Sequence, residues 1–316
     1  MIENKTEEKI ATRKAFGKAL AELGAKNKNI VVLDADVSSS LYTGMFAEAF
    51  PERHFNFGIA EMNMVGAACG FAIRGKIPFA CSFAVFSMGR AWEQARTSVG
   101  YGNFNVKIVG SHGGISVGED GATHQALEDI ACARVIPNFK VFCPSDATQT
   151  KSLMNFIVDD YGPTYLRLSR PPVPVIFDSS YKFRLGKSDV IKDGGDVCIF
   201  SIGMLTHSAI EAAKKLESQD ISTAVIDMCS IKPIDEDLII EYAKKCKFIV
   251  SAEDHNIIGG LGGAISEVLT SKYQKNLYRI GMEDVFGESG KFEDLYKKYE
   301  FDAEGLAHKI LKLFNK

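Results

Sequence analysis

"NIVVLDAD", residues 29–36, is a short run rich in β-branched residues, and similar runs recur along the whole chain. Each run is followed by a stretch with helical periodicity, such as "SDATQTKSLMNFIVDD" at residues 145–160. Strands that alternate with helices in this way are typical of parallel α/β sheets. The sequence therefore predicts an α/β fold in which mainly parallel sheets are flanked by helices.

The alternation breaks at "SRPPVPVIFDSSYKFRLGK", residues 169–187, which contains three prolines and has no helical period. Stretches of this kind separate domains, and a chain of 316 residues is long enough for two domains that each bury a core. We expect a first domain at residues 1–172, a linker at 173–187 and a second domain at 188–316, each built on a mainly parallel sheet.

The composition and charge of the chain disfavour several classes of protein. The formal net charge of −3 leaves no basic surplus for binding a nucleic-acid backbone. The first residues lack the apolar core of a signal peptide, and the chain has no run of about 18 apolar residues that would span a membrane. The seven cysteines form no CxxC pair and mostly lie in apolar runs, where reduced, buried thiols are expected. We therefore expect a cytoplasmic protein that binds neither nucleic acid nor membrane.

The helix-like run "FGIAEMNMVGAACGFA", Phe57–Ala72, contains a single carboxylate, Glu61. The helix dipole alone favours a glutamate in the first turn by a few tenths to about 1 kcal/mol. The positions one turn away are apolar or small, however, so this carboxyl would be desolvated, with its pKa raised, unless a partner hydrogen-bonds it. The run alone leaves capping and function both open, and its small residues suit a close subunit contact.

A second group of polar residues lies in "SHGGISVGEDGATHQALEDIA", residues 111–131, after a predicted strand and before a helix expected from about Thr123. Its polar side chains include His112, Glu119, Asp120 and His124. A glycine-rich strand-to-helix loop lets such side chains converge on a ligand, because glycine takes positive φ and allows close approach. A metal site made by this chain alone is disfavoured, since neither HxxxH spacing nor a CxxC partner is present.

Together these segments resemble the C-terminal half of transketolase, a thiamine-diphosphate enzyme that moves two-carbon ketol units between sugars. The matching segments appear in family order over essentially the whole chain. In the first domain they are "ATRKAFGKAL", "VVLDADVSSS", "FGIAEMNMVGAACGFA", "GEDGATHQALEDIA", "IPNFKVFCPSDATQT" and "YLRLSRPPVP". In the second they are "IKPID" and "EDHNIIGGLGGAISEVL". The resemblance implies a thiamine-diphosphate pyrimidine-binding domain followed by a transketolase C-terminal domain.

The resemblance also implies a role for Glu61. In this family a glutamic acid hydrogen-bonds the pyrimidine nitrogen of the cofactor and favours the imino tautomer, which takes the proton from the thiazolium carbon. Such a bond requires a carboxyl that is shielded from water. Glu61 matches the family's glutamate in position, so it is expected to act in catalysis and in cofactor binding.

Further roles are implied residue by residue. Phe83 and Phe86, whose spacing alone is more typical of core residues, match the aromatic residues that flank the pyrimidine ring, and Asp36 matches a position near the thiazolium. Asp120 and His124 match residues that contact substrate hydroxyls, and His124 also suits proton transfer at the ketol oxygen. The residues expected to hold the sugar phosphate are Arg13, Ser40, His112 and Arg170.

Two positions depart from the usual transketolase pattern. His112 is followed by glycine in "SHGG", where typical full-length transketolases have an acidic residue. Arg90 in "MGRAWEQ" is instead similar to the related deoxyxylulose-phosphate synthases. The matches at His112 and Ser40 nevertheless favour transketolase.

One family motif is missing from the sequence. Thiamine enzymes of this group hold the diphosphate through a divalent ion bound by "GDG" and a following asparagine on a separate domain, and no "GDG" occurs here. "GGLGG" at residues 259–263 also fails the GxGxxG spacing of dinucleotide sites. We therefore expect the C-terminal subunit of a split transketolase, inactive alone. A separate N-terminal subunit would supply the site for the diphosphate and Mg²⁺ or Ca²⁺, in an α2β2 heterotetramer. The substrates would be sugar phosphates of the pentose phosphate type or, equally, an unusual sugar of a branch pathway.

Three other functions compete with this interpretation. The β subunit of a thiamine-dependent 2-oxoacid dehydrogenase shares the architecture and the glutamate but lacks the "GEDGxTHQ" pattern seen here. A deoxyxylulose-phosphate-synthase-like enzyme is usually one long chain. A catalytically silent scaffolding subunit is disfavoured because the expected catalytic and substrate-binding residues are all present.

Overall fold

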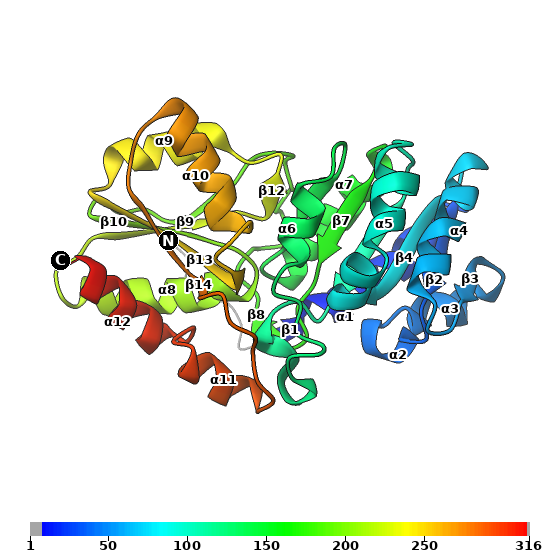
Figure 1. The fold of residues 1–316 in the computed structure, drawn as a ribbon, viewed down its shortest axis with the longest axis horizontal. Helices are drawn as coiled ribbons and strands as arrows, with labels where there is room; N and C mark the ends of the chain where they lie inside the picture. Colours follow the sequence, from blue (N-terminus) through cyan, green and yellow to red (C-terminus); the bar gives the residue numbers. More distant parts are fainter. Residues whose placement is uncertain (1–7, 315–316) are drawn as a thin grey trace.

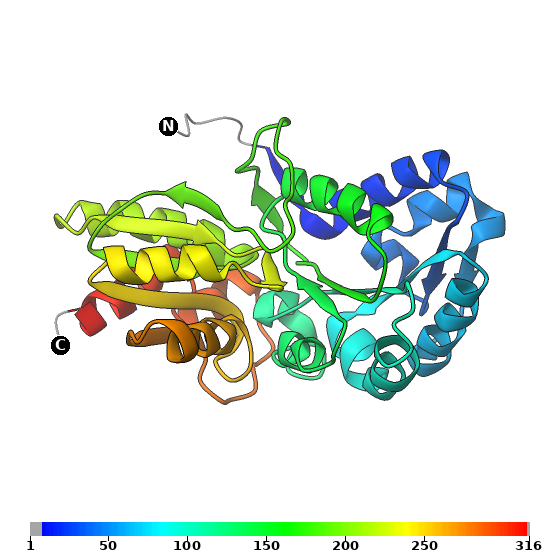
Figure 2. The same ribbon diagram turned by 90° about the horizontal axis from the view of Figure 1, so that it is seen from above.

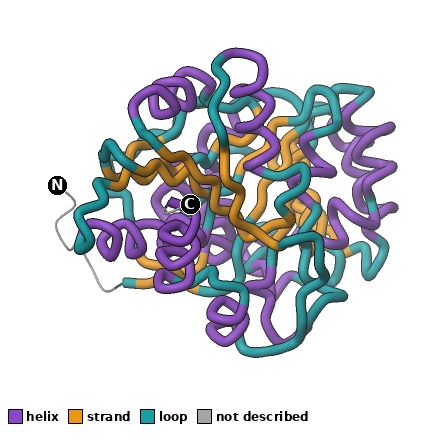
Figure 3. The backbone as a smooth tube through the Cα atoms, turned by 60° about the vertical axis from the view of Figure 1, so that its left-hand side comes forward, coloured by secondary structure: helices purple, strands orange, loops and turns teal. Residues whose placement is uncertain are grey.

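The computed structural model describes residues 8–314 of the chain. The chain folds into two α/β units that lie end to end along the longest axis of the molecule (Figures 1 and 2). In both units the strands run through the middle, and the helices lie outside them (Figure 3). The expected α/β fold with two sheet-based domains is confirmed. The first seven residues of the expected N-terminal domain and the last two of the C-terminal domain lie outside the described residues.

Within residues 8–314, seven strands form the sheet of the first unit. Neighbouring strands are parallel except at one edge, where β12 pairs antiparallel with β6. Counted from that edge, the strands are β12 (Ser230–Lys232), β6 (Lys140–Phe142), β7 (Thr164–Arg167), β5 (Lys107–Ser111), β4 (Ile77–Phe83), β2 (Ile30–Asp34) and β3 (His54–Asn56). Strands β2 and β5 are buried along their whole length, because a parallel sheet is covered by helices on both faces.

The described part of the second unit has a five-stranded sheet, which is parallel except for β9 at one edge. Its strands, in order, are β14 (Leu277–Met282), β13 (Phe248–Asn256), β10 (Val197–Ser201), β11 (Thr223–Asp227) and β9 (Asp189–Lys192). The runs "DVCIFSIG", "STAVIDM" and "KFIVSAED" supply β10, β11 and β13. The strands predicted from these runs are therefore confirmed.

Helices cover both faces of each sheet. On the first sheet α1 and α7 pack on one face, and α4 and α6 on the other; on the second sheet α8 and α12 oppose α9 and α10. The α-helices of the first unit are α1 (Thr12–Lys26), α2 (Ser38–Leu41), α3 (Gly44–Ala49), α4 (Glu61–Ile73), α5 (Trp92–Gln94), α6 (Asp129–Arg134) and α7 (Ala147–Asp159). Those of the second are α8 (Met204–Glu217), α9 (Glu236–Lys245), α10 (Leu261–Lys272), α11 (Phe292–Lys298) and α12 (Ala303–Phe314).

Short helices of other types complete the first unit. They are the 3-10 helices η1 (Pro51–Arg53) and η4 (Ile115–Asp120) and the π-helices η2 (Val85–Arg90) and η3 (Ala95–Gly100). No helix in the described part of the chain is long and apolar enough to cross a membrane. All seven cysteines are free, and all except Cys132 are buried, as expected.

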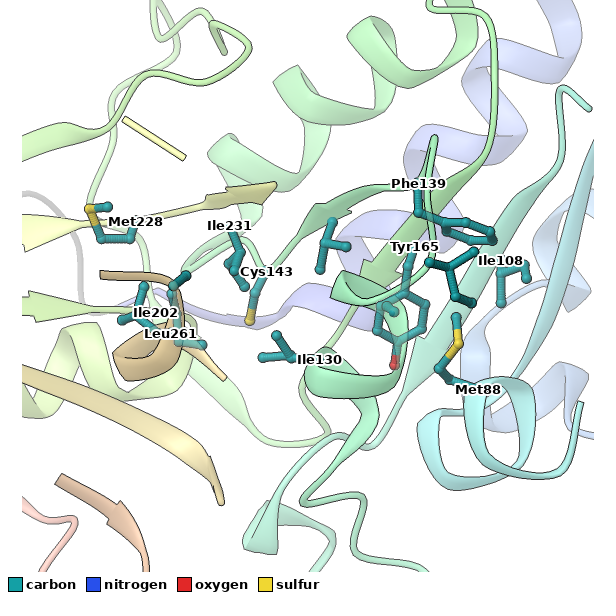
Figure 4. Close-up of a cluster of buried hydrophobic side chains, with 14 of the residues drawn as sticks. Met88, Ile108, Ile130, Phe139, Cys143, Tyr165, Ile202, Met228, Ile231 and Leu261 are labelled. Atoms are coloured by element: carbon teal, nitrogen blue, oxygen red, sulfur yellow. The ribbon is translucent and has the colours of Figure 1, made fainter. Parts of the chain in front are cut away.

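Strand pairing and a shared core hold the two units together, in addition to the segment that connects them. That segment has no helix or strand between β8 (Pro172–Pro174) and β9, and β8 pairs antiparallel with β1 (Lys9–Ala11). Strand β12 follows β11 along the chain but completes the sheet of the first unit. Buried side chains also form one continuous cluster from Tyr165 through Ile130 to Leu261 (Figure 4). The second unit is therefore packed firmly against the first.

Candidate active site

The residues expected at the site lie where strands of the first sheet end. Asp36 follows β2, Phe83 is the last residue of β4, and His112 follows β5. Arg170 comes after β7, and Glu61 begins the helix that follows β3. Because the carboxyl ends of parallel strands meet at one edge of a sheet, side chains from distant parts of the sequence converge there. This edge is therefore the candidate active site.

Glu61 is a buried carboxylate that is paired with Arg90. Its side chain is 2% exposed, and its Oε2 accepts a hydrogen bond of 2.8 Å from Nη1 of Arg90. The Arg90 guanidinium also lies over the ring of Phe86, 4.6 Å from its centroid. Arg90 is thus the hydrogen-bond partner that the sequence left unidentified. Helical spacing does not reveal it, because it lies 29 residues further on, in η2.

Aromatic rings and imidazoles form the next layer of the site. Phe83 and Phe86 are nearly parallel, at 13°, with centroids 6.2 Å apart. Phe83 stacks on His112 at 4.0 Å, and Phe86 meets His124 edge-on at 5.3 Å. Both phenylalanines are only partly buried, and Phe83 also packs against a buried core cluster, as its spacing suggests. The folded chain brings both expected aromatic residues beside both expected histidines.

The residues expected to hold a phosphate also lie together. Arg13 donates from Nε to the main-chain oxygen of Arg170 at 3.0 Å, and from Nη1 to the main-chain oxygen of Ser40. The Arg170 guanidinium bonds to the Glu119 carboxylate at 3.2 Å, with side chains 37% and 65% exposed respectively. Such an exposed ion pair is worth only about 0–1 kcal/mol, so breaking the Arg170–Glu119 pair costs little.

His112 is held neutral by its surroundings. Its side chain is buried, and burial, together with the charges of Arg13 and Arg170, lowers the pKa of His112 to about 3. Its Nδ1 lies 2.8 Å from the Ser111 hydroxyl. At neutral pH this imidazole is therefore a hydrogen-bonding group, and the positive charge of the site comes from the two arginines.

The lowered pKa of His112 predicts that the stability of the folded protein depends on pH. The folded-state pKa lies below the ordinary value of 6.5, so the stability contributed by neutral His112 is fully present above about pH 6.5 and is lost as the pH falls toward the folded-state value. Below about pH 6 the wild type should lose up to about 1.4 kcal/mol per pH unit relative to His112→Gln. Urea unfolding at a series of pH values measures the difference. The curve for His308→Gln, at an exposed histidine, should run parallel to that of the wild type, and a parallel His112→Gln curve would contradict the prediction.

The segment that carries Asp120 and His124 differs from the expected helix. The helix predicted from about Thr123 begins only at Asp129, and residues up to 128 form a loop that includes η4. The reason is that main-chain groups before the helix bond to other segments: the oxygen of Ala126 accepts from Gly114 N–H at 2.9 Å, and that of Leu127 from Asn256 N–H at 2.8 Å. The loop leaves Asp120 exposed and His124 half-buried.

Asp36 makes a reciprocal contact with Asn56, which the sequence did not single out. Asp36 N–H donates to Asn56 Oδ1 at 3.1 Å, and Asn56 Nδ2 donates to Asp36 Oδ1 at 3.0 Å. Asp36 has a φ of 63°, in the left-handed region that aspartate tolerates better than most residues. The pair keeps the Asp36 carboxylate oriented at the end of β2.

These residues fit one part of thiamine diphosphate better than another. A water-shielded carboxyl, together with two partly exposed aromatic rings at the same edge of the sheet, suits the aminopyrimidine ring, which needs a partner for its ring nitrogen and flat apolar faces. Within residues 8–314, no group of three or more His, Cys, Asp or Glu side chains is placed to hold a metal ion. The described residues therefore fit the pyrimidine end of the cofactor.

Comparison with known proteins identifies the family. The sequence matches the family "Transketolase, pyrimidine binding domain" over residues 8–175 and "Transketolase, C-terminal domain" over residues 186–306. It is 48% identical to a transketolase C-terminal section of Methanocaldococcus jannaschii, over 96% of each chain. It is 37% identical to a 6-deoxy-6-sulfo-D-fructose transketolase subunit of a Clostridium strain, over 96% of this chain and 95% of that one.

A solved structure gives the same result. The fold superposes with a TM-score of 0.90 on a split-gene transketolase described as an inactive β4 tetramer, at 48% identity, covering 97% of this chain and 99% of that one. These matches do not favour a 2-oxoacid dehydrogenase subunit or a deoxyxylulose-phosphate synthase. The buried glutamate and the aromatic pair lie at the expected edge of the sheet. This chain belongs to the transketolase family, as a C-terminal section that carries the pyrimidine-binding and C-terminal domains.

Proposed function

We propose that this chain is one subunit of a thiamine-diphosphate-dependent transketolase that transfers a two-carbon ketol unit from a ketose phosphate to an aldose phosphate. The observation that carries the proposal is Glu61, a buried carboxylate that pairs with Arg90, whose guanidinium lies over the partly exposed ring of Phe86. The ring of Phe83 lies next to that of Phe86. A structural cap needs neither burial nor aromatic neighbours. A carboxyl that tunes an aminopyrimidine needs both.

Each group of side chains has a distinct task in this proposal. Glu61 holds the pyrimidine nitrogen, while Phe83 and Phe86 flank the ring and Asp36 approaches the thiazolium end. The bound cofactor supplies a carbon nucleophile for cleaving the bond next to the ketose carbonyl. His124 contacts a substrate hydroxyl and moves a proton at the ketol oxygen, which suits a half-buried imidazole next to Phe86.

The substrate phosphate is bound by a second group of residues. Arg13 and Arg170 offer permanently charged, forked donors. Neutral His112 adds a hydrogen bond, Ser40 lies beside Arg13, and Asp120 reaches a sugar hydroxyl. Since the Arg170–Glu119 pair is exposed, exchanging the Glu119 carboxylate for a phosphate costs little and gains the attraction of a second negative charge.

A separate N-terminal subunit completes the enzyme in this proposal. It supplies the site for the diphosphate and Mg²⁺ or Ca²⁺, and two such pairs form an α2β2 heterotetramer in the cytoplasm that acts on sugars of the pentose phosphate type. Support comes from the relatives' descriptions as a C-terminal section, a subunit and a split-gene product. The surface around α4 adds support: Ile59, Met62 and Ile73 are 77%, 51% and 65% exposed, as expected of an uncovered contact face.

Reconstitution with that partner tests the proposal. The chain is purified alone and together with the product of a neighbouring reading frame that encodes an N-terminal transketolase section. We expect ketol transfer, measured with thiamine diphosphate, Mg²⁺ and a panel of phosphorylated ketoses and aldoses, only when both chains are present. A homodimer of this chain that binds the metal and transfers ketol units without a partner would refute the split arrangement.

Replacing Arg170 with glutamine tests the phosphate site. Loss of charge-assisted hydrogen bonds worth about 1.5–3 kcal/mol should raise KM for phosphorylated acceptors by about 10- to 100-fold. KM for an unphosphorylated aldose should hardly change, because it makes no contact with this guanidinium. Arg184→Gln, at an arginine in the connecting segment that is 66% exposed, is the matched control. Equal losses with both classes of acceptor would remove Arg170 from the phosphate site.

A further inference from the structure

The loop that carries the proposed substrate residues is held in place by the second unit. Residues 112–118 and 125–127 are buried. In the segment between them Glu119, Asp120 and Thr123 are exposed, whereas Ala122 and His124 are partly buried and Gly121 is buried. That segment carries Asp120 and His124. The loop thus has two buried anchors and a partly exposed tip, and both anchors contact the second unit.

The first anchor is the carboxylate of Asp254, near the carboxyl end of β13. Its Oδ1 accepts a hydrogen bond of 2.9 Å from Ile115 N–H, and its Oδ2 accepts one of 2.9 Å from the Tyr296 hydroxyl. Asp254 is only 3% exposed. Contact is so close that a Cβ added at Gly114, where φ is +77°, would lie 2.2 Å from the Asp254 carboxyl carbon. The carboxylate therefore fixes the main chain directly after His112.

The second anchor lies on the other side of the partly exposed tip. Asn256 N–H donates to the main-chain oxygen of Leu127 at 2.8 Å, and Gln125 Nε2 donates to the main-chain oxygen of Glu288 at 2.9 Å. Both partners belong to the second unit. At both anchors, therefore, hydrogen bonds to the second unit help to fix the path of the loop main chain, in addition to its connection to the first sheet.

We propose that Asp254 is a positioning residue for the substrate loop, and that the C-terminal domain acts in the reaction by holding the loop that bears His112, Asp120 and His124. The inference rests on the proposed function of those three residues. Asp254 contacts the loop at Gly114 and Ile115, so it acts through the main chain of these two residues.

Charge makes this anchor stronger than an ordinary hydrogen bond. A buried carboxylate that accepts from a main-chain N–H forms a charge-assisted bond, which is roughly twice as strong as a neutral one. Asparagine has the same shape, but it has no charge and only one acceptor oxygen for the two donors. Asp254→Asn should therefore loosen the loop while keeping the surrounding packing.

Hydrogen exchange of the reconstituted pair tests the inference directly. In Asp254→Asn, amide exchange in peptides covering residues 111–128 should be about tenfold faster than in the wild type, with peptides of β2 and α4 unchanged. Tyr296→Phe keeps the carboxylate on Ile115 and should change exchange in the loop far less. Asp193→Asn, at a surface aspartate of the same domain, is the control and should change nothing. Unchanged exchange of the loop in Asp254→Asn, or equally faster exchange throughout the first unit, would overturn the inference.

Kinetics provide the second readout. kcat/KM for the sugar phosphates should fall about tenfold or more in Asp254→Asn. Binding of thiamine diphosphate, measured by equilibrium dialysis, should fall far less, because Glu61, Phe83 and Phe86 lie on other elements and only the two rings touch the loop, at His112 and His124. A parallel loss of cofactor affinity would indicate a merely structural role and contradict the proposal. If the wild-type pair transfers no ketol unit, the proposed function fails, and the exchange experiment still decides whether Asp254 holds the loop.

Discussion

Replacing Glu61 with glutamine is expected to lower ketol transfer by the reconstituted pair by about 10²- to 10⁴-fold, the range typical of losing a positioned acid–base group. Glutamine keeps the size of the side chain and its place at the start of α4. It cannot share or exchange a proton with a pyrimidine nitrogen, so it cannot favour the reactive tautomer. Glu61→Ala should be at least as inactive.

The folded state should survive this change. Glu61 loses its ion pair with Arg90, but the Arg90 side chain is 43% exposed and can turn to water, so circular dichroism and the thermal midpoint should stay close to the wild type. Glu93→Gln, at an exposed carboxylate in the neighbouring α5, is the matched control and should retain activity. Wild-type rates in Glu61→Gln would overturn the mechanism and return Glu61 to the role of a helix cap.

Replacing Arg167 with leucine is expected to destabilise the chain by about 3–5 kcal/mol, because it leaves a buried charge without its partner. The Arg167 side chain is 5% exposed, and its Nε lies 2.9 Å from Oδ2 of Asp129, whose side chain is 1% exposed. Its Nη2 also donates to the main-chain oxygens of Asp254, at 2.7 Å, and Ala126, at 3.3 Å. Leucine satisfies none of these groups.

Unfolding in urea, followed by circular dichroism, measures this loss as a fall in the midpoint. The matched control is Arg184→Leu, which removes an exposed arginine that lies 3.8 Å from Asp189 and should cost no more than about 1 kcal/mol. If both variants unfold at the same urea concentration, the expected cost of leaving the buried charge of Asp129 without its partner is wrong. Tyr165, whose hydroxyl donates to the same Asp129 oxygen at 2.6 Å, compensates in part and places the expected loss toward the lower end of the range.

The sequence predicts the candidate site residues from short motifs, and their roles stay predictions. Each motif ends a strand or begins a helix, and parallel strands present those ends at one edge of the sheet. The strands at "NIVVLDAD" and "NVKIVGSH" and the helix that begins at Glu61 follow from patterns spanning a few residues, so local sequence sufficed for them.

The partners of those residues could not be predicted in the same way. The Glu61–Arg90 pair spans 29 residues and depends on the π-helical turn of η2, which has no simple hydrophobic period. The helix expected from Thr123 does not form, because the main-chain oxygens of Ala126 and Leu127 accept hydrogen bonds from Gly114 and Asn256 instead. A local sequence pattern does not reveal partners that are distant along the chain.

The sequence by itself therefore determined the α/β class, the two sheets, the family and the chemical groups available at the site, because these depend on periodicity and on motifs that are local. Only the tertiary structure decided that Arg90 pairs with Glu61, that β12 completes the sheet of the other unit, and that the Asp254 carboxylate accepts a hydrogen bond from Ile115 N–H. In each case groups that are distant along the sequence compete to bind a buried charge or a main-chain donor, and the most favourable bond forms. That competition takes place only when the whole chain is folded.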